Sequence, residues 1–254
     1  MKNYEAVIEL GCFSLKELAK KLNCCIPTAA SLIQQYLKNG YIERVRRDLY
    51  VAISIETKQP MLSRYQIGSR LAEDAYISHH SAFEVYGYAN QVFYEVYVAT
   101  KTRFTDFMYN GILYHRVAPK RNADIGKING VAVSSVEQTV IDSICDMEKI
   151  GGLEETIRSI LLIPSLNADK LLKALENTNN GFVYQKCGYI LEGLNDSLHL
   201  PDSFFAECEK HTSNAKRYLT KEHTGYIQHK KWKLFGPENI KSIVDKGLSG
   251  YDTI

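Results

Sequence analysis

The sequence predicts an α+β fold, in which a small N-terminal domain of three helices and a β-hairpin precedes a larger mixed α/β domain with a small antiparallel sheet and several helices. Three observations predict this fold. Apolar residues recur at helical spacing through residues 3–38. Two short strand patterns follow within residues 41–53. Beyond residue 60, strand patterns with Asn-Gly turns give way to a run of amphipathic helices.

The composition is that of a soluble globular protein, with 45% hydrophobic and 24% charged residues in a chain of 254. No apolar run approaches the roughly 20 residues that a membrane-spanning helix needs. Residues 1–10 lack the basic start and the apolar stretch of a secretory signal. The six cysteines form no C-x-x-C pair and no Cys/His cluster with zinc-ligand spacing. We therefore expect a cytoplasmic protein with reduced thiols, no membrane contact, no metal and no cofactor.

The first two helices are predicted from apolar spacing and from end signals. Residues 3–10 carry an apolar face, and Gly11 ends that helix. Ser14 and Glu17 fit a capping box, in which the serine hydroxyl accepts an otherwise unpaired amide and the glutamate reaches back. A second helix is therefore expected over residues 15–22.

The third helix is the element expected to contact a partner. Pro27 suits its first turn, where the missing amide costs nothing, and the helix closes at Asn39-Gly40 after about Lys38. Its apolar stripe is Ala29, Ala30, Ile33, Tyr36 and Leu37. Its opposite face presents small, amide or basic side chains, Thr28, Ser31, Gln34, Gln35 and Lys38. Side chains of these types can reach base edges or phosphates in a major groove.

A basic β-hairpin is predicted directly after the third helix. Residues 41–45 and 49–53 fit two short strands, and Arg44, Arg46 and Arg47 lie beside the turn between them. Helix, turn, helix and basic hairpin follow the order of a winged helix-turn-helix. In that arrangement the three arginines anchor the wing, with Arg46 and Arg47 beside the DNA backbone or in a minor groove.

The distribution of charge agrees with DNA as the partner without deciding it. Residues 1–60 hold nine basic and six acidic side chains, whereas the remainder has one more acid than base. The excess therefore lies in the segment expected to face phosphate. The alternative is a winged-helix protein-interaction module without specific DNA binding, in which Gln34 and Gln35 are only a solvated helix face.

The remainder of the chain predicts strands followed by helices. We place the domains at residues 1–60 and 61–254, and a boundary anywhere between Ile55 and Ser78 fits equally well. Asn110-Gly111 is a strong hairpin signal because both residues tolerate positive φ. Ser134 or Ser135 is expected to cap the helix that follows, and Ser134 with Glu137 fits a capping box. The segments around Trp232 are expected to be irregular. Helices are expected over residues 63–71, 78–87, 134–147, 152–162, 168–175 and 182–194 and from 201, and strands over 92–99, 103–109, 112–117 and 131–133.

No catalytic constellation is found, and we predict that the protein is not an enzyme. Gly68-Ser69 fits the start of a nucleotidyltransferase site, but the acids Glu73-Asp74 are adjacent, so on a strand they point to opposite faces. The segment 95–97 lacks the lysine of a restriction-type nuclease site, and no P-loop, G-x-S-x-G or H-E-x-x-H motif is present. His79-His80 point in different directions on a helix, so we expect a cap or core role and no metal.

Several segments resemble, in this order, the AbiEi-type antitoxins, regulators encoded beside nucleotidyltransferase toxins in bacterial type IV toxin–antitoxin, phage-defence operons. The segments are RVRRDLYV (Arg44 to Val51), DAYISHHSAFEVYG (Asp74 to Gly87), NQVFYEVYVATKTRF (Asn90 to Phe104), VAVSSVEQTVIDSI (Val131 to Ile144) and GGLEE (Gly151 to Glu155). They cover about the first two thirds of the chain, and the second is the most specific.

The resemblance implies that the N-terminal domain binds inverted repeats in double-stranded operator DNA and represses its own operon. It also implies that the C-terminal domain counteracts the nucleotidyltransferase toxin and assists cooperative DNA binding. Direct toxin binding does not follow, since toxin and antitoxin of this type need not form a stable complex. Such wings commonly end in Arg-Gly. Asp48 replaces that glycine here, which bears on the geometry of Arg46 and Arg47.

Overall fold

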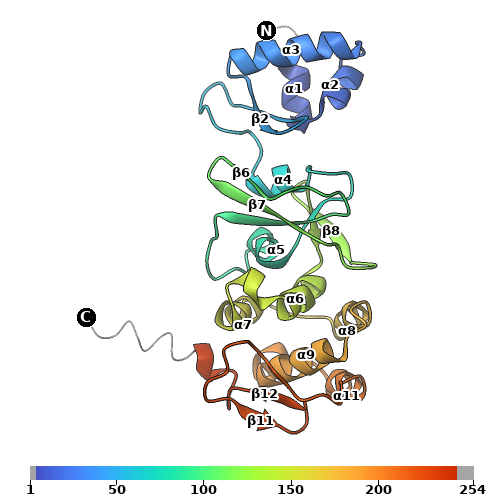
Figure 1. Cartoon of the computed structure of the whole chain (residues 1–254), viewed down its shortest axis with the longest axis vertical. Coiled ribbons are helices and arrows are strands. Elements are labelled where there is room, and N and C mark those ends of the chain that lie inside the picture. Colours follow the sequence, from blue (N-terminus) through green and yellow to red (C-terminus); the bar gives the residue numbers. More distant parts are fainter. Residues whose placement is uncertain (1–3, 245–254) are drawn as a thin grey trace, which may run out of the picture. The chain divides into compact units, whose positions relative to one another are not determined.

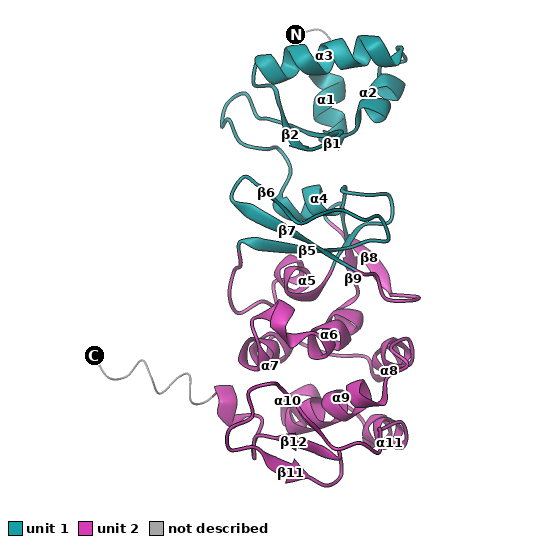
Figure 2. Cartoon of the chain, viewed as in Figure 1, with its two compact units in different colours: residues 1–77, 94–117, 129–132 teal, residues 78–93, 118–128, 133–254 magenta. Residues whose placement is uncertain are grey.

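The computed structural model describes residues 4–244, so Asn3 of the first expected helix lies outside the described residues. Within this range the chain is a mixed α/β structure with eleven α-helices, one 3-10 helix and three sheets (Figure 1). It divides into two compact units (Figure 2). Unit 1 holds residues 1–77, 94–117 and 129–132, and unit 2 holds residues 78–93, 118–128 and 133–254. The predicted domain boundary after residue 60 stays a prediction.

The helices and strands of residues 4–244 have the following bounds. The helices are α1 (Tyr4–Leu10), α2 (Leu15–Lys21), α3 (Ile26–Lys38), α4 (Arg64–Gly68), α5 (His79–Tyr86), α6 (Val136–Cys145), η1 (Met147–Ile150), α7 (Leu153–Leu161), α8 (Ala168–Glu176), α9 (Gly181–Gly193), α10 (Asn195–Leu198) and α11 (Asp202–Lys210). The strands are β1 (Cys12–Phe13), β2 (Ile42–Arg46), β3 (Leu49–Ala52), β4 (Tyr76–Ile77), β5 (Glu95–Ala99), β6 (Phe107–Tyr109), β7 (Ile112–Val117), β8 (Ile125–Ile128), β9 (Val131–Ser134), β10 (Arg217–Tyr218), β11 (Ile227–His229) and β12 (Leu234–Gly236).

Unit 1 begins with three helices and a three-stranded antiparallel sheet of order β1-β3-β2. The capping box at α2 is confirmed, since Ser14 accepts the Glu17 amide and its own amide donates to Glu17 Oε2 at 2.7 Å. At the end of α3, Asn39 keeps a right-handed conformation and Gly40, with φ +69°, supplies the left-handed turn. The apolar faces meet in one core that includes Val7, Phe13, Leu18, Ile33, Tyr36 and Ile42.

A six-stranded sheet has the order β6-β7-β5-β4-β9-β8. The predicted Asn-Gly hairpin is confirmed, because Asn110 (φ 49°) and Gly111 (φ 74°) join β6 to β7. The sheet is mixed, whereas an antiparallel sheet was expected. β4 pairs antiparallel with β5, and β6 with β7, but β7 pairs parallel with β5. Tyr114 of β7 is 1% exposed in the sheet interior, whereas Met108 of β6 is 69% exposed at its edge.

Helices α5 to α11 belong to unit 2, where their apolar faces share one core. The predicted capping box of Ser134 and Glu137 is wrong. Ser135 instead accepts the Gln138 amide at the start of α6, and the Ser134 hydroxyl lies 2.8 Å from that of Thr139. The reason is that β9 continues through Ser134, so the helix cap falls one residue later.

A third sheet, of order β10-β12-β11, is present where irregular segments were expected. Trp232 precedes β12, is 2% exposed, and donates its indole hydrogen to Glu192 Oε2 at 2.7 Å. Its ring packs against Gly188 of α9, where an added Cβ would overlap the ring. Strands of two or three residues carry too little periodicity to be recognised in a sequence, which explains why this sheet was missed.

Candidate nucleic-acid interface

The turn between α2 and α3 fixes the direction of α3. Asn23 takes a left-handed conformation with φ 49°, and the Cys24 amide donates to the Ala19 carbonyl at 3.0 Å. Cys25 is the N-cap and Pro27 lies in the first turn of α3, as predicted. Asparagine tolerates positive φ, so this reversal is made with little backbone strain.

The structure brings the five predicted residues of α3 together on its exposed face. Its opposite face buries Ala29, Ile33 and Tyr36 in the core of unit 1. The exposed set is Thr28, Ser31, Gln34, Gln35 and Lys38. Because the two sets lie on opposite sides of one helix, the polar face contributes nothing to the core.

The hydrogen bonds of these five side chains differ. Thr28 Oγ1 lies 3.1 Å from Cys25 Sγ, and this contact lowers the pKa of the Cys25 thiol. Ser31 donates to the Pro27 carbonyl at 3.1 Å. Within residues 4–244, Gln34, Gln35 and Lys38 have no hydrogen-bond partner for their side chains. Three of the five are therefore available to a ligand without breaking an internal bond.

A shallow hollow of about 280 Å³ lies against the N-terminal half of this face. Its lining residues are Leu22, Cys24, Thr28, Ser31, Leu32 and Gln35. The prediction from sequence included three of them and missed the three that come from the turn and from the flank of α3. Leu22 follows the apolar spacing of the second helix, and that spacing gives no sign that a residue also borders the surface.

The β2–β3 hairpin carries the three predicted arginines, and the structure separates their roles. The register shifts between Arg44 and Arg46, which marks a β-bulge, and Val45 between them is buried. Arg44 is exposed, and its Nε donates to the Arg46 carbonyl at 3.3 Å. Arg47 is exposed in the turn and has no side-chain partner among the described residues. Arg44 and Arg47 can therefore reach an external anion.

Arg46 differs from the other two because its guanidinium group faces other parts of unit 1. Its Nη2 donates to the Leu71 carbonyl at 2.6 Å, and its Cζ lies 5.2 Å from the centroid of the Phe104 ring. Partial burial lowers the pKa of Arg46. These contacts hold the hairpin against the rest of unit 1, and they occupy the group that was expected to meet DNA.

Asp48 gives the hairpin tip its geometry. Its φ of 55° is left-handed, a conformation that aspartate adopts more readily than most residues. Its Oδ1 accepts the amide of Leu15 at 3.0 Å, the first residue of α2. An acidic side chain at a helix N-terminus pairs an otherwise unbonded amide and complements the helix dipole. The aspartate in place of glycine therefore preserves the turn and adds a tie to α2.

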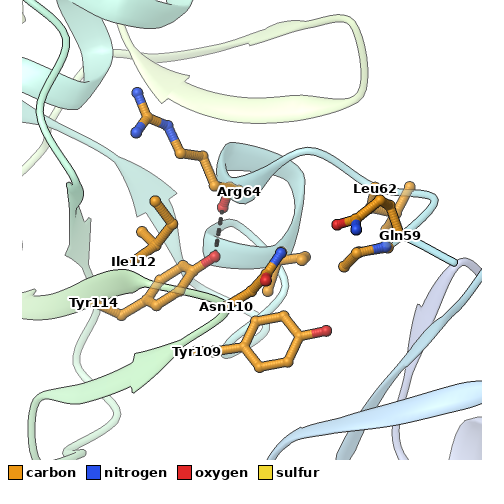
Figure 3. Close-up of a pocket in the computed structure, with 9 residues that line it drawn as sticks. Gln59, Leu62, Arg64, Tyr109, Asn110, Ile112 and Tyr114 are labelled. Carbon is orange, nitrogen blue, oxygen red and sulfur yellow. Dashed lines mark hydrogen bonds between the residues drawn. The ribbon is translucent and has the colours of Figure 1, made fainter. Parts of the chain in front are cut away.

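A second contact ties the hairpin to the six-stranded sheet within unit 1. Tyr109 of β6 donates to Glu43 Oε2 of β2 at 2.7 Å, and burial together with this carboxylate raises the pKa of Tyr109. Nearby, Tyr114 donates to the Arg64 carbonyl at 3.3 Å (Figure 3). A hollow of about 180 Å³ lies between residues 59–67 and the β6–β7 turn.

The histidine pair set aside by the sequence analysis lies in the interior of unit 2. His79 Nδ1 is 2.9 Å from Ser78 Oγ, and His79 Nε2 is 3.6 Å from Asp146. His80 lies 3.6 Å from Glu84 and 3.4 Å from Glu155. In the part of the chain that the structure describes, no group of three or more His, Cys, Asp or Glu side chains could hold a metal ion. The pair therefore takes part in a buried polar network of unit 2.

Comparison of the sequence with protein-family models and with curated proteins found no match. Across residues 4–244, no helix combines the length and the apolar character needed to cross a membrane.

Proposed function

We propose that the N-terminal domain is a winged helix-turn-helix that binds double-stranded DNA, with α3 in the major groove. The observation that carries this proposal is the polar face of α3, on which Gln34, Gln35 and Lys38 have no described partner. Amide side chains of this kind pair with adenine in a bidentate manner, and lysine pairs with guanine or phosphate. Thr28 and Ser31, at the start of the same face, complete the contact surface.

In this proposal the hairpin is the wing, and its three arginines have different roles. Arg47 and Arg44 contact the phosphate backbone or the minor groove. Arg46 positions the wing through Leu71 and Phe104, and it does not contact DNA. Because the wing is tied to α2 through Asp48, wing and recognition helix meet DNA as one unit.

The biological role that we propose rests on the resemblance to AbiEi-type antitoxins. The protein is a cytoplasmic repressor of its own operon that binds inverted repeats, and it counteracts a nucleotidyltransferase toxin. It has no catalytic role of its own. The antitoxin part is tested by co-expression with the neighbouring toxin gene, where growth must be restored by the full chain.

The DNA-binding part is tested by a salt-titrated mobility shift of the full chain on DNA from immediately upstream of its gene. Arg47→Ala should weaken binding to all sequences alike and reduce the salt slope by about one unit, as expected for one lost phosphate contact. Gln34→Ala or Gln35→Ala should relax the preference at one base position by about 1–3 kcal/mol. Arg46→Met should leave the salt slope unchanged, because the proposal gives Arg46 no phosphate contact.

Lys173→Ala on α8, an exposed lysine of unit 2, is the control and should bind as the wild-type chain does. Absence of any shift at low salt would contradict the proposal. A stable complex with the toxin in co-purification, together with that absence, would favour the protein-interaction module instead.

A further inference from the structure

A pocket of unit 2 is lined by residues that are distant in the chain from the proposed DNA-binding residues. It has a volume of about 810 Å³, within the range of sites that hold small molecules. Three parts of unit 2 form it: residues 145–153, the first turns of α9, and residues 218–226. Its position is therefore defined by packed elements and does not depend on one mobile side chain.

Apolar and aromatic side chains form much of the pocket wall. They are Met147, Leu153, Phe182, Tyr218, Leu219 and Tyr226. The segment that carries the tyrosines is internally bonded, since the Tyr226 hydroxyl lies 2.6 Å from Thr220 Oγ1 and the Tyr218 ring lies 4.2 Å from that of His223. An ordered aromatic wall favours a ligand with a flat ring, because ring stacking adds to the burial of apolar surface.

The charges that line the pocket largely neutralise one another. Asp146 lies 3.0 Å from Lys149, and His79 and Lys149 hold the pKa of Asp146 well below its usual range. Glu148 pairs with Lys221 at 2.6 Å. Glu222 is exposed at the rim. Two ion pairs therefore leave one acid, Glu222 at the exposed rim, and one lining cation without a carboxylate partner among the described residues.

That cation is Lys186 of α9. Its Nζ lies 5.0 Å from the centroid of the Phe182 ring, and within residues 4–244 no carboxylate lies within ion-pair distance of it. Burial lowers the pKa of Lys186, because a partly buried ammonium group is less well hydrated than an exposed one. Arg217 lies 5.0 Å from the same ring centroid. An anion beside Lys186 would replace the hydration that the ammonium group loses on burial, and it would lie next to an aromatic ring.

We propose that this pocket binds a small anion that carries one planar ring, with the anionic group at Lys186 and the ring against the aromatic wall. Among the described residues that line the pocket, Lys186 is the one cation without a carboxylate partner, which matches a single phosphate or carboxylate group better than a polyphosphate. Nucleoside monophosphates and aromatic carboxylates share this chemistry, and the experiment distinguishes them.

The test is isothermal titration of the full chain with AMP, CMP and indole-3-acetate, and with adenosine as the uncharged comparison. Binding of at least one anion is expected, with adenosine at least tenfold weaker, as expected for the loss of one charge-assisted contact. Lys186→Met should weaken binding of that anion by about tenfold or more for the same reason. Lys173→Met on α8, which does not line the pocket, should change nothing.

A second variant keeps the test decisive if Lys186→Met folds poorly. Leu153→Trp fills the pocket from α7 and leaves Lys186 in place, so it too should abolish binding. No binding of any of the three anions up to millimolar concentration would overturn the proposal. Equal binding of adenosine and AMP, or wild-type affinity in both variants, would also overturn it.

Discussion

At the scale of one residue, Asp48 performs two structural tasks. It holds a left-handed conformation in the hairpin turn, and its carboxylate accepts the amide of Leu15 at the start of α2. Glycine at this position would satisfy only the first task and alanine would satisfy neither. Asp48 therefore links the hairpin turn to the start of α2, where Leu15 lies 33 residues earlier in the chain.

We expect Asp48→Gly to destabilise unit 1 by about 1 kcal/mol through the lost helix cap. Asp48→Ala should cost about 2 kcal/mol, because strain at positive φ is added. Asp48→Asn keeps an acceptor and tolerates the turn, so it should lie closest to the wild type. Urea unfolding followed by far-UV circular dichroism measures this order, since the single tryptophan, Trp232, belongs to unit 2. Equal stability of the alanine and glycine variants would contradict the role of backbone strain.

At the scale of elements, the sequence predicted long helices well and short strands poorly. α6 to α9 lie within two residues of the expected bounds, because their apolar faces repeat over several turns. β1 and β10 to β12 were missed because each is two or three residues long. The polar face of α3 was predicted from the same periodicity. The inward position of Arg46 was not, since it depends on Leu71 and Phe104, which are distant in the chain.

The packing of α9 against the third sheet gives a prediction at this scale. Gly188→Ala should destabilise unit 2 by about 1–3 kcal/mol, because its methyl group enters the space of the Trp232 ring. Trp232 fluorescence should shift in the folded variant, and urea unfolding should occur at lower concentration. Gly126→Ala on β8, where nothing lies within 4 Å of the added Cβ, is the matched control. An unshifted Trp232 emission in Gly188→Ala would show that the contact is not as tight as described.

At the scale of the whole molecule, buried tyrosines in both units determine how the protein responds to alkali. Burial raises the pKa of Tyr86 and Tyr184 to about 12 in unit 2. Burial also raises the pKa of Tyr109 and Tyr114 in unit 1. An unfolded tyrosine loses its proton near pH 10, so ionisation favours the unfolded chain. These groups contribute stability that is fully present below about pH 10 and is lost above it.

We therefore expect Tm to stay level up to about pH 9 and to fall above about pH 10. Thermal unfolding by circular dichroism, together with phenolate absorbance at each pH, measures this. Tyr184→Phe removes one buried phenol whose hydroxyl has no described hydrogen bond. The decline in Tm above pH 10 should therefore be smaller for this variant than for the wild type. If Tyr184→Phe removes a phenolate titration near pH 10 from the folded chain and none at higher pH, the burial of Tyr184 would be contradicted.

The exposed side chains at Gln34, Gln35 and Lys38 have one more consequence if α3 reads DNA. Because none of them supports the core, their identities can change with little cost to folding. Under the proposed function, natural variants of this chain can therefore change these side chains and bind other operators while the fold is kept. For the same reason, a library randomised at these three codons would yield mostly folded proteins, and under the proposed function variants with new DNA preferences could be selected from it.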